Sequence, residues 1–179
     1  MTLTRHLSAA LIVLGAGTGF AAVAHAEGKT VSMNLISAEG GGAPIGTIAL
    51  EDSAGGLVLK TNLKGLPPGE HGFHLHVNPS CAPGEQDGKV AAGIGAGGHF
   101  DPHETHKHLG PDADGHQGDL PVLKVASDGS AMETLTAPHL KLADMTGHAL
   151  MIHAGGDNYA DQPKPLGGGG PRIACGVIQ

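Results

Sequence analysis

Glycine and proline interrupt this sequence at short intervals, and that punctuation leaves little room for long helices. The chain of 179 residues contains 31 glycines and 12 prolines. Between them lie short runs in which apolar and polar residues alternate, such as the run with Val31, Met33 and Leu35 and the run 57–63. Alternation with a period of two is the pattern of a β-strand with one buried face. Asp128-Gly129, between two alternating runs, predicts a β-hairpin turn.

About eight such runs follow one another between residues 29 and 179, and none shows a sustained period of 3.6 residues. We therefore predict an all-β domain, either a sandwich or a barrel. Two connections, residues 79–120 and 155–171, lack clear periodicity and are unusually long. Long loops inside a compact domain are usually functional, so the chemistry of the protein is expected there.

The first 26 residues are predicted to be a secretory signal peptide. A basic start with Arg5 precedes an apolar run, and the segment ends in Ala24-His25-Ala26, a cleavage pattern of small residues. A transmembrane anchor is the alternative. The glycines within the apolar run disfavour it, because a span needs about 20 strongly apolar residues. Cleavage after Ala26 would leave residues 27–179 as one domain without a membrane anchor.

The net charge limits the possible binding partners, and the cysteine content bears on whether the protein forms a disulfide. The net charge is −7, whereas nucleic-acid binding requires basic patches, so no nucleic-acid partner is expected. The only two cysteines are Cys81 and Cys175. After export they would meet an oxidising compartment, which favours one disulfide. Two unpaired thiols, or two further metal ligands, are the alternatives that the residues alone leave open.

The stretch HGFHLH at residues 71–76 places three histidines in six positions. Side chains on a strand alternate between two faces, so His74 and His76 would point one way and Leu75 the other. Two neutral imidazoles directed at one point in space indicate a metal site.

The connection 79–120 carries further candidate ligands. His99, His108 and His116 are spaced nine and eight residues apart and are followed by Asp119. A zinc ion is held by four nitrogen, sulfur or carboxylate donors in a tetrahedral shell, which this set could provide. The alternative is a solvated, histidine-rich loop that binds metal only adventitiously. His153, at the end of a later apolar run, would on its own be an ordinary hydrogen-bonded residue.

Together these motifs resemble the copper/zinc superoxide dismutases, and among them the periplasmic bacterial branch. The matching stretches occur in family order and cover about residues 29–179: HGFHLH (71–76), GGHFDP (97–102), KHLGPDADGHQGDLP (107–121), HAGGD (153–157) and PRIACGVI (171–178). The resemblance implies an eight-stranded antiparallel Greek-key β-barrel or sandwich of immunoglobulin-like form, with long metal-binding loops. It also implies a periplasmic location.

The resemblance assigns a role to each motif residue. The implied copper ligands are His74, His76, His99 and His153. The implied zinc ligands are His99, His108, His116 and Asp119, with His99 bridging the two ions. Asp157 would join a copper histidine to a zinc histidine, and His71 would support the fold. Cys81 and Cys175 match the family's disulfide. His103 and His106 match no ligand position and are expected to be solvated.

The activity implied by the resemblance is dismutation of superoxide to oxygen and hydrogen peroxide. It proceeds by alternate reduction and oxidation of a histidine-bound copper, with a structural zinc and one ion of each kind per subunit. Arg172 matches the family's active-site arginine, and a permanently charged guanidinium would attract the anionic substrate. His99 would act as a proton carrier as well as a ligand. Lys89 is a further candidate for steering, with a merely solvated lysine as the alternative.

Two other hypotheses remain at this stage. A non-catalytic periplasmic copper or zinc buffer on the same sandwich would need neither Arg172 nor an open copper position. A structural sandwich whose histidines only stabilise loops would not explain why His153, distant in sequence, completes a four-histidine set. The assembly is also open, because the bacterial branch contains both monomers and homodimers.

Overall fold

A computed structural model describes residues 28–179, which fold almost entirely into antiparallel strands and loops. The predicted signal peptide, residues 1–26, lies outside the described residues. Within residues 28–179, no helix has the length and apolar character needed to cross a membrane. The elements are β1 (Lys29–Ser37), β2 (Gly40–Ser53), β3 (Gly56–Leu63), β4 (Gly69–His71), β5 (Phe73–His76), β6 (Gly84–Gln86), β7 (Lys89–Ala91), η1 (Ile94–Ala96), β8 (Leu123–Val125), β9 (Thr134–Ala137), η2 (Leu142–Asp144), β10 (Ala149–His153), η3 (Leu166–Gly168) and β11 (Arg172–Val177).

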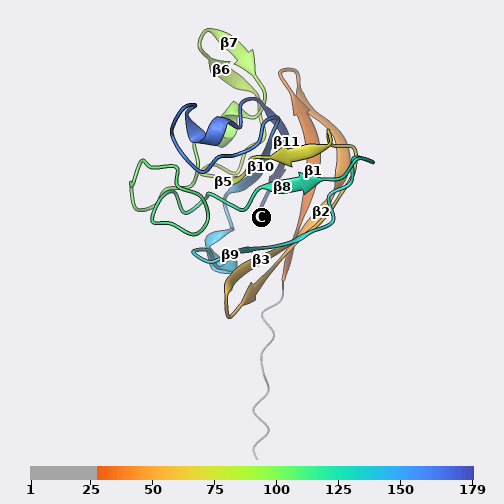
Figure 1. Ribbon diagram of the computed structural model, residues 1–179. Helices are drawn as coiled ribbons and strands as arrows, with labels where there is room; N and C mark the ends of the chain where they lie inside the picture. The colour runs from red at the N-terminus through yellow and green to blue at the C-terminus, as the bar shows by residue number, and fades with distance from the viewer. Residues whose placement is uncertain (1–27) are drawn as a thin grey trace, which may run out of the picture.

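The main sheet has seven strands in the order β5-β10-β11-β1-β2-β3-β9. It is strongly curled, with β9 and β3 on one side and β5 and β10 on the other (Figure 1). β4 precedes β5 with only Gly72 between them, and β4 pairs with β8. If β4 and β5 are taken as one interrupted strand, β8 is the eighth strand of the curled structure. The prediction of an all-β antiparallel barrel or sandwich is confirmed.

The core follows the predicted alternation closely on β3, where Leu57, Leu59 and Leu63 are fully buried. On β1 the alternation breaks. Val31 and Met33 are buried as predicted, but Leu35 is only partly buried. The pairing of β1 with β2 shifts register on both sides of Asn34, and such a bulge adds a residue that turns the side chains after it.

The turn predicted at Asp128-Gly129 is present, although its flanking strands pair elsewhere. Gly129 has a φ of 80°, and the amide of Ala126 donates to the carbonyl of Ser130 at 2.8 Å. Beyond this turn, β8 pairs with β4 while β9 pairs with β3. The turn therefore links the two ends of the curled sheet instead of forming a simple hairpin.

The long connection 79–120 contains more regular structure than predicted, because β6 and β7 form a small hairpin that is followed by η1. A disulfide between Cys81 and Cys175 ties this loop to β11, with an S–S distance of 1.97 Å. The disulfide settles the alternatives that the residues alone left open. It sets the loop against the end of the barrel where β5, β10 and β11 lie side by side.

Replacing both cysteines, as Cys81→Ser with Cys175→Ser, is expected to lower the free energy of unfolding of the metal-free protein by about 4 kcal/mol. The reason is the sequence separation of 94 residues, which leaves the unfolded chain much freer once the link is gone. Urea denaturation followed by circular dichroism measures the change. Reduced wild-type protein is the control and should match the variant, whereas equal stabilities of oxidised wild type and variant would contradict the expectation.

Candidate metal centre

The centre begins on β5, where Leu75 lies in the hydrophobic core while His74 and His76 face the opposite side. Both imidazoles are fully buried. β10 runs beside β5 and ends at His153, which brings a third imidazole to the same place. The ring centroids of His74 and His153 are 4.8 Å apart. The prediction that the His-x-His pair shares one face is confirmed.

Backbone pairing brings the long loop onto β5. The amide of Leu75 donates to the carbonyl of Gly118 at 2.9 Å, and the carbonyl of Leu75 accepts from the amide of Phe100 at 2.8 Å. As a result, the backbone of His99 forms an isolated antiparallel β-bridge with that of His76, and the backbone of Asp119 forms another with that of His74. Two distant loop residues thereby face the strand histidines.

One group of four imidazoles meets the geometric requirement for an ion, since one ligand atom from each lies within 4.8 Å of the others. Its members are His74, His76, His99 and His153. The hydrogen bond made by one nitrogen of a ring shows that the other nitrogen of that ring is free to bind an ion. His76 Nδ1 donates to the carbonyl of Gly97 at 2.9 Å and His153 Nδ1 to that of Gly170 at 3.1 Å. A carbonyl can only accept, so the neutral ring keeps its lone pair on Nε2.

These free nitrogens are buried and without any hydrogen-bond partner. The unpartnered atoms in this group are His74 Nδ1, His76 Nε2, His99 Nε2 and His153 Nε2. A buried polar atom without a partner costs roughly 1–3 kcal/mol, so four of them at one point require a ligand that accepts four lone pairs. A copper ion fits this donor set, because imidazole nitrogen is among its preferred ligands.

A second group surrounds the carboxylate of Asp119. His99 Nδ1 lies 2.9 Å from its Oδ1, His108 Nδ1 lies 2.9 Å from its Oδ2, and His116 Nδ1 lies 3.4 Å from its Oδ1. His108 Nδ1 and His116 Nδ1 are buried and make no hydrogen bond. Three nitrogens and a carboxylate are a donor set that suits tetrahedral zinc.

His116 is the loosest member of this second group. A tighter set of atoms within 4.8 Å of one another comprises His74, His99, His108 and Asp119, and His116 lies outside it. His74 nevertheless has only one free nitrogen, which also belongs to the first group. His116 is therefore the better fourth donor for a second ion.

Asp157 hydrogen-bonds to one histidine of each group; the role that the resemblance implies for it, joining a copper ligand to a zinc ligand, stays a prediction. Its Oδ2 accepts from His74 Nε2 at 2.7 Å, and its Oδ1 accepts from His108 Nε2 at 2.7 Å. Gly167 passes directly over this carboxylate with a φ of 67°. A Cβ there would stand 1.8 Å from Asp157 Oδ1, so only glycine fits.

His71 supports the centre from outside. Its Nδ1 lies 2.7 Å from the carbonyl oxygen of His153, and its Nε2 lies 2.8 Å from that of Pro67. The buried ring thus connects the segment that precedes β4 with the end of β10 and carries no free nitrogen toward either group. The structural role that the resemblance implies for His71 stays a prediction.

The electrostatics keep most of these imidazoles neutral. Burial, together with nearby His99, holds the pKa of His74 well below its usual range, and burial lowers the pKa of His153 to about 4. His108 behaves differently. Burial lowers its pKa, but the neighbouring carboxylates of Asp119 and Asp157 outweigh this effect and raise it to about 9. Neutral rings with free lone pairs are the form that binds metal.

Arg172 lies at the start of β11 beside the first group. Its Nη1 donates to the carbonyl of Gly93 at 2.6 Å and its Nη2 to that of Gly97 at 2.7 Å. The carbonyl of Gly97 also accepts from His76 and so ties the guanidinium to a candidate copper ligand. Burial lowers the pKa of Arg172, which nevertheless remains charged at neutral pH because arginine titrates so high.

A hollow of about 430 Å³ opens from this place to the surface. Arg172, His99 and His153 line it, together with Gln86 and Asp87 from the β6–β7 hairpin. Lys89 is exposed on the same hairpin but does not line the hollow. A small anion could enter this hollow and reach the first histidine group directly beside Arg172.

Two histidines of the loop stay away from the centre. His106 is exposed, with its Nδ1 3.9 Å from Asp101 Oδ2. His103 is exposed and lines a separate surface hollow with Asp114 and His139. Neither belongs to a group with metal-binding geometry, in agreement with the expectation that both are solvated.

Sequence reasoning missed two supports of the centre, the carbonyl of Gly97 and the side chain of Asp161. Asp161 Oδ2 accepts from the amide of His108 at 3.1 Å, across 53 residues of sequence. A main-chain carbonyl carries no residue-specific signal, and an aspartate in a loop is ordinary. Only the folded arrangement reveals them.

Comparison with known proteins identifies the family. Residues 45–178 match the family described as copper/zinc superoxide dismutase (SODC). A superoxide dismutase [Cu-Zn] 2 from Salmonella typhimurium is 54% identical over 176 residues, which cover 98% of this chain and 99% of the relative. The structure is similar to that of the Cu/Zn superoxide dismutase from Brucella abortus, with a TM-score of 0.84 and 55% identity over 86% of this chain and 100% of that one.

A second similar structure is the solution structure of the monomeric copper, zinc superoxide dismutase from Salmonella enterica, with a TM-score of 0.77 and 56% identity. It covers 86% of this chain and 100% of that one. The class of the protein is thus an antiparallel β-barrel with two adjacent histidine groups that could hold metal ions. The chain belongs to the copper/zinc superoxide dismutase family, a family of oxidoreductases.

The metal-free protein is expected to melt at a lower temperature at pH 9.5 than at pH 6.5. The pKa of His108 is raised to about 9, so its ion pairs stabilise the fold fully below the unfolded value of about 6.5. That contribution is lost as the pH rises through 9. Differential scanning calorimetry of chelator-treated protein measures the change.

His108→Gln should abolish most of this pH dependence, while His103→Gln, at an exposed position, should retain it. An equal melting temperature of wild type at both pH values would contradict the assignment of the ion pairs to His108.

Proposed function

We propose that this protein dismutates superoxide in the periplasm, so that two superoxide ions and two protons yield oxygen and hydrogen peroxide. The observation that carries the proposal is His99, which belongs to both histidine groups, next to an arginine that lines the hollow. A protein that only stored metal would need neither a shared imidazole nor a guanidinium at an open face. The metal-buffer hypothesis therefore explains less of the site.

The two groups correspond to two ions in each subunit. The proposed copper ligands are His74, His76, His99 and His153. The proposed zinc ligands are His99, His108, His116 and Asp119. When bound, copper would supply the reversible one-electron chemistry, and zinc, which has no redox chemistry, would supply structure and fixed charge.

Arg172 would hold the substrate. The net charge of −7 repels an anion from the protein as a whole, so a local positive charge has to outweigh it. Two of the five guanidinium N–H groups are used by the carbonyls of Gly93 and Gly97. These bonds fix the orientation of the group and leave other donors for a superoxide oxygen. Lys89 on β7 would add a weaker attraction near the mouth of the hollow.

His99 would carry one of the two protons that the product requires. Its Nε2 belongs to the first group and its Nδ1 to the second, so a proton can reside on Nε2 while Nδ1 keeps its place. Asp157 would fix the ring orientations of His74 and His108 by accepting from both. The chain's own contribution is thus a set of rings that need little movement during turnover.

The predicted signal peptide and the disulfide support the proposed location, and the origin of the proposed ligands supports the proposed assembly. Residues 1–26, with cleavage after Ala26, would export the chain, and the disulfide suits an oxidising compartment. Every proposed ligand comes from one chain, so a monomer is sufficient, as in the monomeric Salmonella enterica relative. A homodimer would have to form away from the hollow.

Superoxide decay measured by pulse radiolysis tests the function. Protein loaded with one copper and one zinc, with metal content determined on the same sample, is expected to react close to the diffusion limit per copper. The rate should fall with added salt, because screening weakens the attraction of an anion to Arg172. Full metal load with negligible decay would support the metal buffer instead.

Arg172→Ala is expected to leave the copper and zinc content unchanged and to lower the rate about tenfold, the lower end of known electrostatic steering effects. Arg172→Lys should lose less, because it keeps the charge and gives up only the fork of donors. Lys141→Ala, at an exposed lysine that does not line the hollow, is the matched control for the loss of one positive charge. Equal rates for wild type and Arg172→Ala would contradict the role of Arg172.

A further inference from the structure

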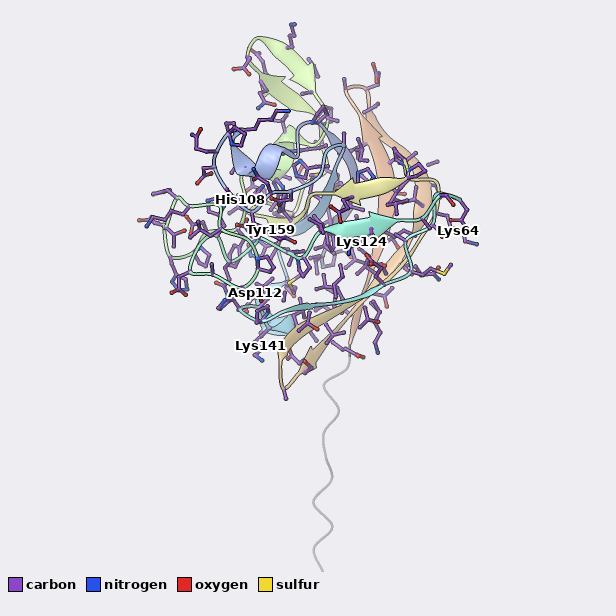
Figure 2. All side chains as sticks on the ribbon, viewed as in Figure 1. Lys64, His108, Asp112, Lys124, Lys141 and Tyr159 are labelled. Atoms are coloured by element: carbon purple, nitrogen blue, oxygen red, sulfur yellow. A yellow bond between two sulfur atoms is a disulfide. The ribbon has the colours of Figure 1, made fainter. Side chains whose placement is uncertain are left out.

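Tyr159 contacts residues of both long connections and lies near His108, a candidate zinc ligand (Figure 2). It is the only tyrosine of the chain, which has no tryptophan. The residue is half-buried, and its φ of 54° lies in the left-handed region that non-glycine residues rarely adopt. Such a backbone conformation persists only where the surroundings hold it in place.

The first contact of Tyr159 is with Asp157. Its amide donates to Asp157 Oδ1 at 2.8 Å, and the same oxygen accepts from His108 Nε2 at 2.7 Å. The backbone of Tyr159 therefore helps to set the carboxylate that orients a candidate zinc ligand.

The second contact is with the other loop, 79–120 and the residues that follow it. The phenol oxygen accepts from the amide of Val122 at 2.9 Å. The ring packs on the backbone at Gly110, where a Cβ would stand 2.6 Å from Tyr159 Cγ. The amides of Gly110 and Leu109 in turn donate to Asp119 Oδ2 at 3.3 and 3.1 Å. The ring thus backs the turn that holds the zinc carboxylate.

We propose that Tyr159 is a positioning residue that fastens the 155–171 loop to the 107–122 segment and thereby slows the release of zinc. It touches no metal ligand atom, and it acts through Asp157 on one side and through Gly110 on the other. Partners of this outer kind change metal affinity about 10- to 100-fold when they are lost. The inference rests on the zinc site of the proposed function.

The chain offers its own reporter of this contact. Because Tyr159 is the sole tyrosine and there is no tryptophan, the tyrosine fluorescence of the protein comes from this one position. Removal of zinc with a chelator is expected to change that emission at the same rate as zinc leaves, since the loops on both sides of the ring lose their common ion.

The closing experiment follows zinc transfer from the copper- and zinc-loaded protein to a colorimetric chelator. Tyr159→Ala should release zinc 10- to 100-fold faster than wild type, because both the ring and the phenol are lost. Tyr159→Phe keeps the ring and loses one hydrogen bond, so about fivefold is expected. Lys164→Ala, an exposed position on the same loop, is the control and should match wild type.

Two further readouts separate positioning from general stability. The melting-temperature difference between zinc-loaded and metal-free protein should shrink in both tyrosine variants, because it reports zinc binding alone. Cobalt placed in the zinc site should show altered visible bands in Tyr159→Ala. Wild-type release rates in both variants, or an unchanged difference in melting temperature, would overturn the inference. A wild type that takes up copper but no zinc would overturn the zinc site itself.

Discussion

The structure depends on a set of buried imidazole nitrogens that make no hydrogen bond to any residue the structure describes. Six of them meet at one end of the barrel, on His74, His76, His99, His108, His116 and His153. Each would weaken the fold by roughly 1–3 kcal/mol if nothing satisfied it. The surrounding contacts commit the opposite ring nitrogens of four of these histidines to Asp157 and to backbone carbonyls. The free lone pairs therefore face inward, and a cation is the partner that suits them.

The strands of the barrel and the long loops each supply part of the set of histidines. β5 and β10 supply three rings in rigid positions, because their backbones belong to the main sheet. The loop supplies the others and is held by its pairing with Leu75 and by the disulfide to β11. The carbonyl oxygen of Gly97 connects the proposed copper site with the charge proposed to attract the substrate, because it accepts from both His76 and Arg172. The distance between a candidate copper ligand and the charge that attracts the substrate is thus set by a single peptide group.

Much of this arrangement was predictable, and the parts that were not have physical reasons. The alternation of His74, Leu75 and His76 is a local property of a strand, so their faces followed directly from the sequence. The family motifs named the remaining candidate ligands, which the fold brings together, with His116 held least tightly. Leu35 escaped prediction because a bulge at Asn34 depends on the partner strand.

The β6–β7 hairpin and the role of Tyr159 were not predicted either, because they too depend on structure that a local sequence pattern does not show. The hairpin strands have three residues each, too few to show a periodic pattern. Tyr159 contacts Val122 and Gly110 across more than 35 residues of sequence, as the separation of 37 from Val122 shows. Contacts of this range depend on the folded loops and leave no local signal.

The measurement that tests the central claim most directly is a crystal structure of the copper- and zinc-loaded protein, with anomalous diffraction at both metal edges. The account predicts a copper peak among His74, His76, His99 and His153, and a separate zinc peak beside Asp119, with His99 between the two. A single peak, or metal bound at the hollow of His103 and His139, would contradict it.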